Sequence, residues 1–153
     1  MLWLVAAIVV AMILAALAVY NVVDRTVAGL GQVRIGVMPF QPPAGAAQPD
    51  SITGAILQGF GGTPAAVVGP TTTAAYAGSD DGVRRLGDDF GLDFVLNGRF
   101  SDGRLVAELI RASDGAQVWM ASYDDLSDGQ RIGRDISQQV TGVLALQVSP
   151  ERR

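Results

Sequence analysis

Two Ser-Asp-Gly triplets, at residues 101–103 and 113–115, divide the stretch 91–124 into three runs of residues that favour β-strands. An Asp-Gly pair between alternating runs is a strong hairpin signal, because a type I′ turn needs positive φ at both central residues. The stretch therefore predicts a three-stranded antiparallel meander, around which the rest of the chain is organised.

The two turns also predict a register. A two-residue turn in the first triplet pairs Leu96 with Leu109, and a second such turn pairs Leu109 with Met120 and Ile110 with Trp119. Side chains alternate between the two faces of a strand. One predicted face is a core made of Phe94, Leu96, Phe100, Leu105, Ala107, Leu109, Val118 and Met120. The other predicted face mixes aromatic with charged side chains and consists of Val95, Asn97, Arg99, Val106, Glu108, Ile110, Trp119 and Tyr123.

The first segment, Leu2 to Val23, carries no charge and is almost entirely apolar. At about 1.5 Å per residue, a helix of this length spans roughly 30 Å, the thickness of the hydrocarbon core of a bilayer. We therefore expect residues 1–24 to form a single transmembrane anchor that contacts the lipid bilayer. One alternative is a cleaved signal peptide with a cleavage site at residues 16–18, although the positively charged start of such peptides is absent. A buried core helix is the third reading.

The rest of the chain predicts one domain of the α+β class, in which a mixed sheet packs on helices. After a linker at residues 25–32, the pattern predicts strands at 33–40 and 65–68 and helices at about 50–60, 79–90 and 127–147. Ser79 is the expected N-cap of the middle helix and Gly91 its C-terminal stop. Loops are expected at 41–49, which is rich in proline, and at 69–78. With the meander, the order is β-α-β-α-β-β-β-α over residues 33–149, followed by a tail at 150–153.

The amino-acid composition limits which catalytic, metal-binding and nucleic-acid-binding functions the chain can have. The chain has no cysteine and no histidine, so it lacks thiolate ligands, the commonest general base and the commonest metal ligand. Its net charge is −4 and no basic run exceeds two residues, which disfavours nucleic-acid binding. The acidic pairs at 80/81, 88/89 and 124/125 are better explained by helix capping and solvation than by metal binding. We therefore expect no catalytic residue, no cofactor and no metal site.

Four segments spread over about residues 33–146 each resemble a motif of a known domain. They read Val-Arg-Ile-Gly-Val-Met-Pro-Phe at 33–40, Gly-Leu-Asp-Phe-Val-Leu-Asn-Gly at 91–98, Arg-Leu-Val-Ala-Glu-Leu-Ile at 104–110 and Ala-Ser-Asp-Gly-Ala-Gln-Val-Trp at 112–119. These segments resemble I-A-V-L-P-F, G-V-x-Y-V-L-E-G, R-V-x-A-Q-L-I-D and A-x-T-G-x-x-L-W of the TolB amino-terminal-like domain. That domain is attached to bacterial adenylate cyclases and to membrane-bound winged-helix regulators of the CadC type.

The resemblance implies a fold and a placement, not an activity, because the catalytic and DNA-binding work of that family belongs to other domains. In the relatives, the comparable domain follows a membrane helix and lies in the periplasm. We therefore expect a single-pass protein of the bacterial inner membrane with a periplasmic soluble domain. Arg25 and Arg34 point the other way, since the positive-inside rule would place their side of the anchor in the cytoplasm.

The function expected from this placement is that of a non-catalytic interaction or sensory module, and not of an enzyme. Its partner would be an envelope or membrane protein, or a second copy of the chain. Arg99, Glu108, Trp119 and Tyr123 are the candidate contact residues, because Trp, Tyr and Arg dominate interface hot spots. For the two aromatic residues, packing under a helix is the favoured alternative. The alternative function is a small-molecule-binding or hydrolytic domain with a site near the proline-rich loop, which a deep pocket with converging polar groups would favour.

Overall fold

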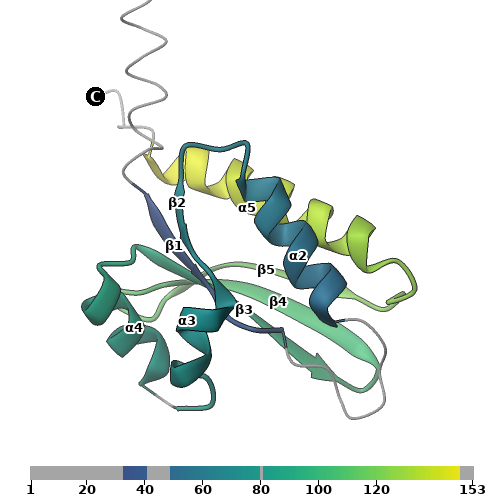
Figure 1. Cartoon of the computed structure of the whole chain (residues 1–153), viewed down its shortest axis with the longest axis horizontal. Helices are drawn as coiled ribbons and strands as arrows, with labels where there is room; N and C mark the ends of the chain where they lie inside the picture. Colours follow the sequence, from purple (N-terminus) through teal and green to yellow (C-terminus); the bar gives the residue numbers. More distant parts are fainter. Residues whose placement is uncertain (1–32, 41–48, 80, 149–153) are drawn as a thin grey trace, which may run out of the picture.

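The structure is a computed structural model that describes residues 33–40, 49–79 and 81–148, and it confirms an α+β fold. A mixed five-stranded sheet has the strand order β2-β1-β3-β4-β5. Helices α2 and α5 cover one face of the sheet, while α3 and α4 lie on the other (Figure 1). The elements are β1 (Arg34–Val37), α2 (Pro49–Phe60), β2 (Ala66–Val68), α3 (Pro70–Thr73), the 3-10 helix η1 (Ala74–Tyr76), α4 (Gly82–Phe90), β3 (Phe94–Ser101), β4 (Arg104–Arg111), β5 (Gln117–Tyr123) and α5 (Gly129–Val148).

The expected membrane anchor, linker, tail and most of the proline-rich loop lie outside the described residues. Within the described ranges, no helix is long and apolar enough to cross a membrane. The anchor over residues 1–24 therefore stays a prediction.

Strand β1 lies between β2 and β3, runs parallel to both and is buried on both faces, as its apolar sequence predicted. Ile35 and Val37 belong to the core beneath α2 and α5, whereas Met38 belongs to a smaller core beneath α4. The strand stops before Pro39, which has no N–H to continue a ladder. Directly after the strand, the Met38 N–H donates a hydrogen bond to the carbonyl oxygen of Leu96 on β3 over 2.9 Å.

Helices α2 and α5 pack closely because small residues face each other along both of them. A Cβ added to Gly133 would lie 2.5 Å from the Cβ of Ala55, so only glycine permits this approach. The successive contacts advance in the same direction along the two helices and pair Ser51 with Gly129, Ala55 with Gly133, and Gly59 with Ser137. Below them, α5 contributes Ile132, Ile136, Val140 and Leu144 to the core, all fully or almost fully buried.

The segment between β2 and α4 is more ordered than the loop we expected, because it forms α3 and η1. Pro70 occupies the start of α3, where its missing N–H costs nothing. The buried Thr73 hydroxyl then donates to the carbonyl oxygen of Val37 over 2.6 Å, which ties the segment to β1. We predicted Ser79 as the N-cap of α4, and this is wrong. The helix starts three residues later, at Gly82, and the Ser79 hydroxyl donates to the carbonyl oxygen of Tyr76.

The C-terminal stop of α4 and the first hairpin are as predicted. Gly91 caps α4 in the left-handed conformation, with φ of 61°. Asp102 and Gly103 both have positive φ, 52° and 77°, as a type I′ turn requires. The pairing of Leu96 with Leu109 across β3 and β4 is confirmed.

The pairing of β4 with β5 differs from the prediction by one residue. The Arg111 N–H donates to the carbonyl oxygen of Ala116 over 2.8 Å, so the loop covers residues 112–115 and is longer than a two-residue turn. This longer loop pairs Arg111 with Ala116, where the predicted turn would pair it with Val118. Because that is a shift of two residues, the longer loop alone would keep every side chain of β5 on its predicted face. A β-bulge next to Leu109 then leaves Val118 as an extra residue, and Trp119 rather than Met120 lies opposite Leu109. A shift of one residue exchanges the two faces of the rest of β5.

Candidate functional site

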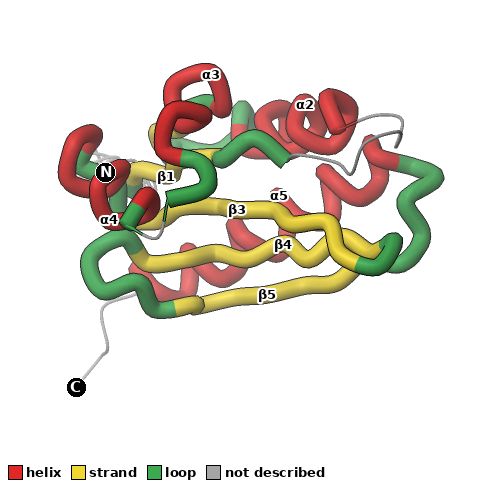
Figure 2. The backbone as a smooth tube through the Cα atoms, turned by 90° about the horizontal axis from the view of Figure 1, so that it is seen from below, coloured by secondary structure: helices red, strands yellow, loops and turns green. Residues whose placement is uncertain are grey.

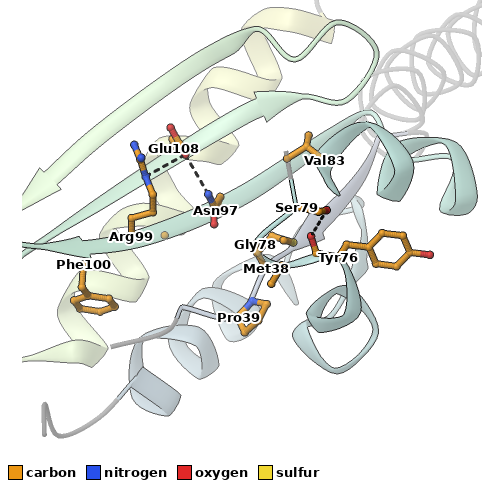
Figure 3. A pocket seen from close by; sticks show the side chains of 12 residues that line it. Met38, Pro39, Tyr76, Gly78, Ser79, Val83, Asn97, Arg99, Phe100 and Glu108 are labelled. Carbon is orange, nitrogen blue, oxygen red and sulfur yellow. Dashed lines mark hydrogen bonds and ion pairs between the residues drawn. The ribbon is translucent and has the colours of Figure 1, made fainter. Parts of the chain in front are cut away.

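An open cleft of about 610 Å³ lies between the sheet and the segment that joins η1 to α4 (Figure 3). One wall comes from the end of β1 and from β3 and β4, and the other from residues 76–79 and α4. The lining residues are Met38, Pro39, Tyr76, Ala77, Gly78, Ser79, Val83, Asn97, Gly98, Arg99, Phe100 and Glu108. Pro39, one of these residues, comes just before the proline-rich loop in the sequence.

Glu108 is the most buried charged residue that the cleft contains. It projects from the middle of β4, and its cross-strand partner on β3 is Asn97. The Asn97 amide nitrogen donates to Glu108 Oε1 over 3.1 Å, and Arg99 Nε lies 3.7 Å from the same oxygen. The Glu108 residue is only 9% exposed, whereas the Arg99 side chain is 67% exposed. The cleft therefore presents a carboxylate at its floor and a loosely held guanidinium at its rim.

Tyr76 belongs to the opposite wall and is held there by contacts with α4. Its hydroxyl donates to Asp89 over 2.6 Å, the Phe90 ring packs edge-on at 6.0 Å, and the Arg85 guanidinium lies 5.9 Å from its ring centre. The hydrogen bond to Asp89 raises the pKa of the Tyr76 phenol above its usual value. Figure 3 shows the ring turned away from Glu108, so Tyr76 shapes the wall without facing the carboxylate.

The four predicted contact residues do not share one face, and this part of the prediction is wrong. Arg99 and Glu108 line the cleft, but the bulge in β5 turns Trp119 and Tyr123 toward α5. Trp119 Nε1 donates to Gln139 over 3.2 Å, and the Tyr123 hydroxyl donates to Asp135 over 2.7 Å. Both aromatic side chains are therefore packed under the C-terminal helix, which was the alternative left open for them.

Met120 takes the position that the sequence had assigned to the aromatic residues. It lies opposite Glu108 on the neighbouring strand and is 58% exposed, which makes it the one large hydrophobic side chain exposed among the described residues. Val106 and Ile110 are its half-buried neighbours on the same face of β4. Figure 2 shows α5 behind β3, β4 and β5, and no described helix in front of β5. The sequence placed Met120 in the core because its pattern carries no signal for the bulge.

The cleft and the open face offer hydrogen bonding, charge and apolar contact. Within the described residues, no cluster of three carboxylate, imidazole or thiolate side chains could hold a metal ion. Glu108 is accompanied by an amide and a guanidinium, which orient and neutralise a carboxylate. This arrangement suits recognition of a ligand or partner.

Comparisons with known proteins add no family. No protein-family profile matches the chain, and no curated protein matches it. Among solved structures, the chain is similar to PelC from Paraburkholderia phytofirmans, described as a dodecamer. The identity is 18%, the match covers 75% of this chain and 89% of PelC, and the TM-score is 0.42. For a point variant of the same PelC, the identity is 17%, the match covers 75% of this chain and 90% of the variant, and the TM-score is 0.43. The lipoprotein GNA1162 from Neisseria meningitidis is 17% identical over 72% of this chain and 97% of that one, with a TM-score of 0.37.

Proposed function

We propose that this protein is a non-catalytic interaction module of the bacterial cell envelope, which is held at the inner membrane by Leu2 to Val23 and acts through protein–protein contacts. The observation that supports this proposal is the open face of β4 and β5, where Met120 is exposed beside half-buried Val106 and Ile110. A group of neighbouring apolar side chains on a sheet face favours a contact surface when polar groups surround it. Arg99 and Glu108 supply these groups on the neighbouring positions.

The membrane anchor strengthens the proposal, because it restricts the domain to a thin layer. Two partners held at the same membrane meet at a high effective concentration, so even a small contact surface becomes occupied. The resemblance to the TolB amino-terminal-like domain supports a periplasmic position for this layer. The partner is then another envelope or membrane protein, or a second copy of the chain.

Cross-linking from position 120 tests the contact surface. The chain has no cysteine, so Met120→Cys creates a unique thiol. In membranes, a thiol-bound photo-cross-linker at this position should capture one defined partner or a dimer. Gln138→Cys, on the exposed side of α5, is the matched control and should not capture it. Equal products from both positions, or none from position 120, would contradict a contact through the open face.

The anchor and its orientation are tested separately from the contact surface. The full-length protein should stay in the membrane fraction after high-salt washing, because its attachment is apolar rather than ionic. A C-terminal fusion to alkaline phosphatase, which is active only in the periplasm, should be active. Release by salt would remove the anchor from the proposal, and an inactive fusion of normal abundance would mean that Arg25 and Arg34 indicate the true orientation.

A second function is favoured by the cleft, and it is that of a small-molecule-binding domain. The cleft includes Pro39, which comes just before the proline-rich loop in the sequence, has a volume within the usual range of ligand sites and gathers polar groups from β3 and β4 around Glu108. The two functions share Arg99 and Glu108 but differ in the rest of the surface: the contact surface adds Met120, which does not line the cleft, whereas the cleft adds residues 76–79 and α4. Variants at position 120 should therefore leave small-molecule binding unchanged.

A further inference from the structure

We propose that the cleft binds a ligand whose recognised group is an organic cation, either a primary ammonium or a guanidinium, on a short apolar stem. The inference rests on the second function proposed above and names the class of ligand. Three observations support it: the few hydrogen bonds to the Glu108 carboxylate, the long distance between Arg99 and that carboxylate, and the apolar side chains that line the cleft beside it.

The Glu108 carboxylate is nearly buried, but its Oε2 has no hydrogen-bond partner among the described residues and stays open to the solvent in the cleft. A carboxylate that is removed from water needs several hydrogen bonds or a close counter-ion. Here Oε1 accepts one bond from a neutral amide, that of Asn97, and Oε2 makes no hydrogen bond to any residue that the structure describes. No side-chain oxygen or nitrogen is sealed from solvent without a partner in the described part of the chain, and Glu108 lines the cleft. A donor group on a ligand in the cleft can therefore replace water at this oxygen.

Arg99 leaves room for such a donor. Its Nε lies 3.7 Å from Glu108 Oε1, beyond the range of a hydrogen bond, and its side chain is 67% exposed. An arginine that neutralised this carboxylate firmly would form a bidentate pair at about 2.8 Å. The side chain can swing into solvent at little cost, because exposed ion pairs contribute little to stability. A bound ammonium or guanidinium would then take its place beside the carboxylate.

The walls near Glu108 suit a short apolar stem. Met38 and Val83 line the same cleft, and the smaller core beneath α4 contains Met38 and packs against Val83. A stem along these side chains gains apolar burial while its charged end reaches the carboxylate, which is how basic side chains usually bury. Among the lining residues that the structure describes, Glu108 alone has a carboxylate, and it is the position expected for a ligand cation.

The test uses the full chain in a non-ionic detergent and three probes of the same size: n-butylammonium, n-butanol and butyrate. Met38 lies in the cleft, so its methyl group, labelled with carbon-13, reports binding by NMR, and the methyl groups of Met1 and Met12 serve as references. We expect n-butylammonium to shift the Met38 signal at millimolar concentration and n-butanol and butyrate to bind at least about tenfold more weakly, because a charge-assisted hydrogen bond is roughly twice as strong as a neutral one.

Three variants sharpen the result. Glu108→Gln keeps the shape but removes the charge, and it should weaken n-butylammonium about tenfold or more. Arg99→Gln removes the competing cation and should strengthen binding. Asp124→Asn changes the net charge by the same amount at an exposed ion pair with Arg104, outside the cleft, and should change binding less than about twofold. Thermal unfolding of each variant confirms that it is folded.

The outcomes separate the cation inference from the binding function. If n-butanol or butyrate binds as well as n-butylammonium, or if Arg99→Gln abolishes binding, the cation inference is overturned, although the cleft remains a binding site. If none of the three probes moves the Met38 signal, both proposals for the cleft are overturned.

Discussion

Leu109→Ala and Met120→Ala together test the register of β4 and β5. Leu109 is fully buried beneath α2 and α5, whereas Met120 is 58% exposed on the other face. Removing the three outer carbons of a buried leucine loses roughly 2.4 kcal/mol, at about 0.8 kcal/mol for each carbon. The cavity left behind adds to this loss, so Leu109→Ala should lower the free energy of unfolding by about 2–5 kcal/mol. Met120→Ala should change it by no more than about 0.5 kcal/mol, as surface substitutions do.

The measurement is urea unfolding of the full chain in non-ionic detergent, followed by far-ultraviolet circular dichroism. The slope of unfolding free energy against urea should be the same for both variants and the parent, which shows that only stability has changed. Similar large losses for both variants would refute the reasoning, because they would place Met120 in the core and remove the bulge. A loss below about 0.5 kcal/mol for Leu109→Ala would mean that the meander does not carry the core at all.

Three further predictions follow from the packing and the turns. Gly98→Ala should destabilise the domain by about 1–3 kcal/mol in the same urea assay, because the added carbon would overlap the ring of Phe40. Burial and the hydrogen bond to Asp135 raise the pKa of the Tyr123 phenol far above its ordinary value of 10.0. Folding therefore favours the protonated phenol. Its contribution to the free energy of unfolding is complete below pH 10.0 and is lost as the pH rises above that value. Tyr123→Phe should reduce this loss of stability at alkaline pH. Gly103→Ala should cost about 1–3 kcal/mol, because φ of 77° strains any other residue, whereas Ser113→Ala, at an exposed position of the second turn without positive φ, should be nearly neutral.

The sequence specified the first hairpin of the meander but not the second, although both contain Ser-Asp-Gly. At Asp102 and Gly103, two residues with positive φ close the turn, and the register follows from local chemistry alone. In the second triplet only Gly115 has positive φ, and its N–H donates to the carbonyl oxygen of Arg111 in a wider loop. The bulge then arises where Trp119 packs against α5, a contact with a segment distant in sequence. Local patterns cannot predict it.

Half of the candidate site was accessible from the sequence, because alternation along β3 and β4 placed Asn97, Arg99 and Glu108 on one face. The opposite wall was not, since the segment 70–76 reads as a loop. Its threonines have low intrinsic helix propensity, and its helical turns depend on the hydrogen bond from Thr73 to the backbone of β1. This tertiary bond has no sequence signal, so the ordered wall was not predicted, although a site near the proline-rich loop was the alternative expectation.

The close fit of α2 with α5 has a consequence for how the protein is made. Residues 49–60 leave the ribosome early, but their partner, residues 129–148, emerges after every other described element of the domain. Until then the apolar underside of the sheet, including Ile35, Leu96 and Leu109, has only α2 to cover it, since Ile132 and Ile136 are still missing. Domains generally fold as units during synthesis, and exposed apolar surface promotes aggregation. A nascent chain stalled before α5 would therefore depend on chaperones, and the final helix completes the fold in a single late step.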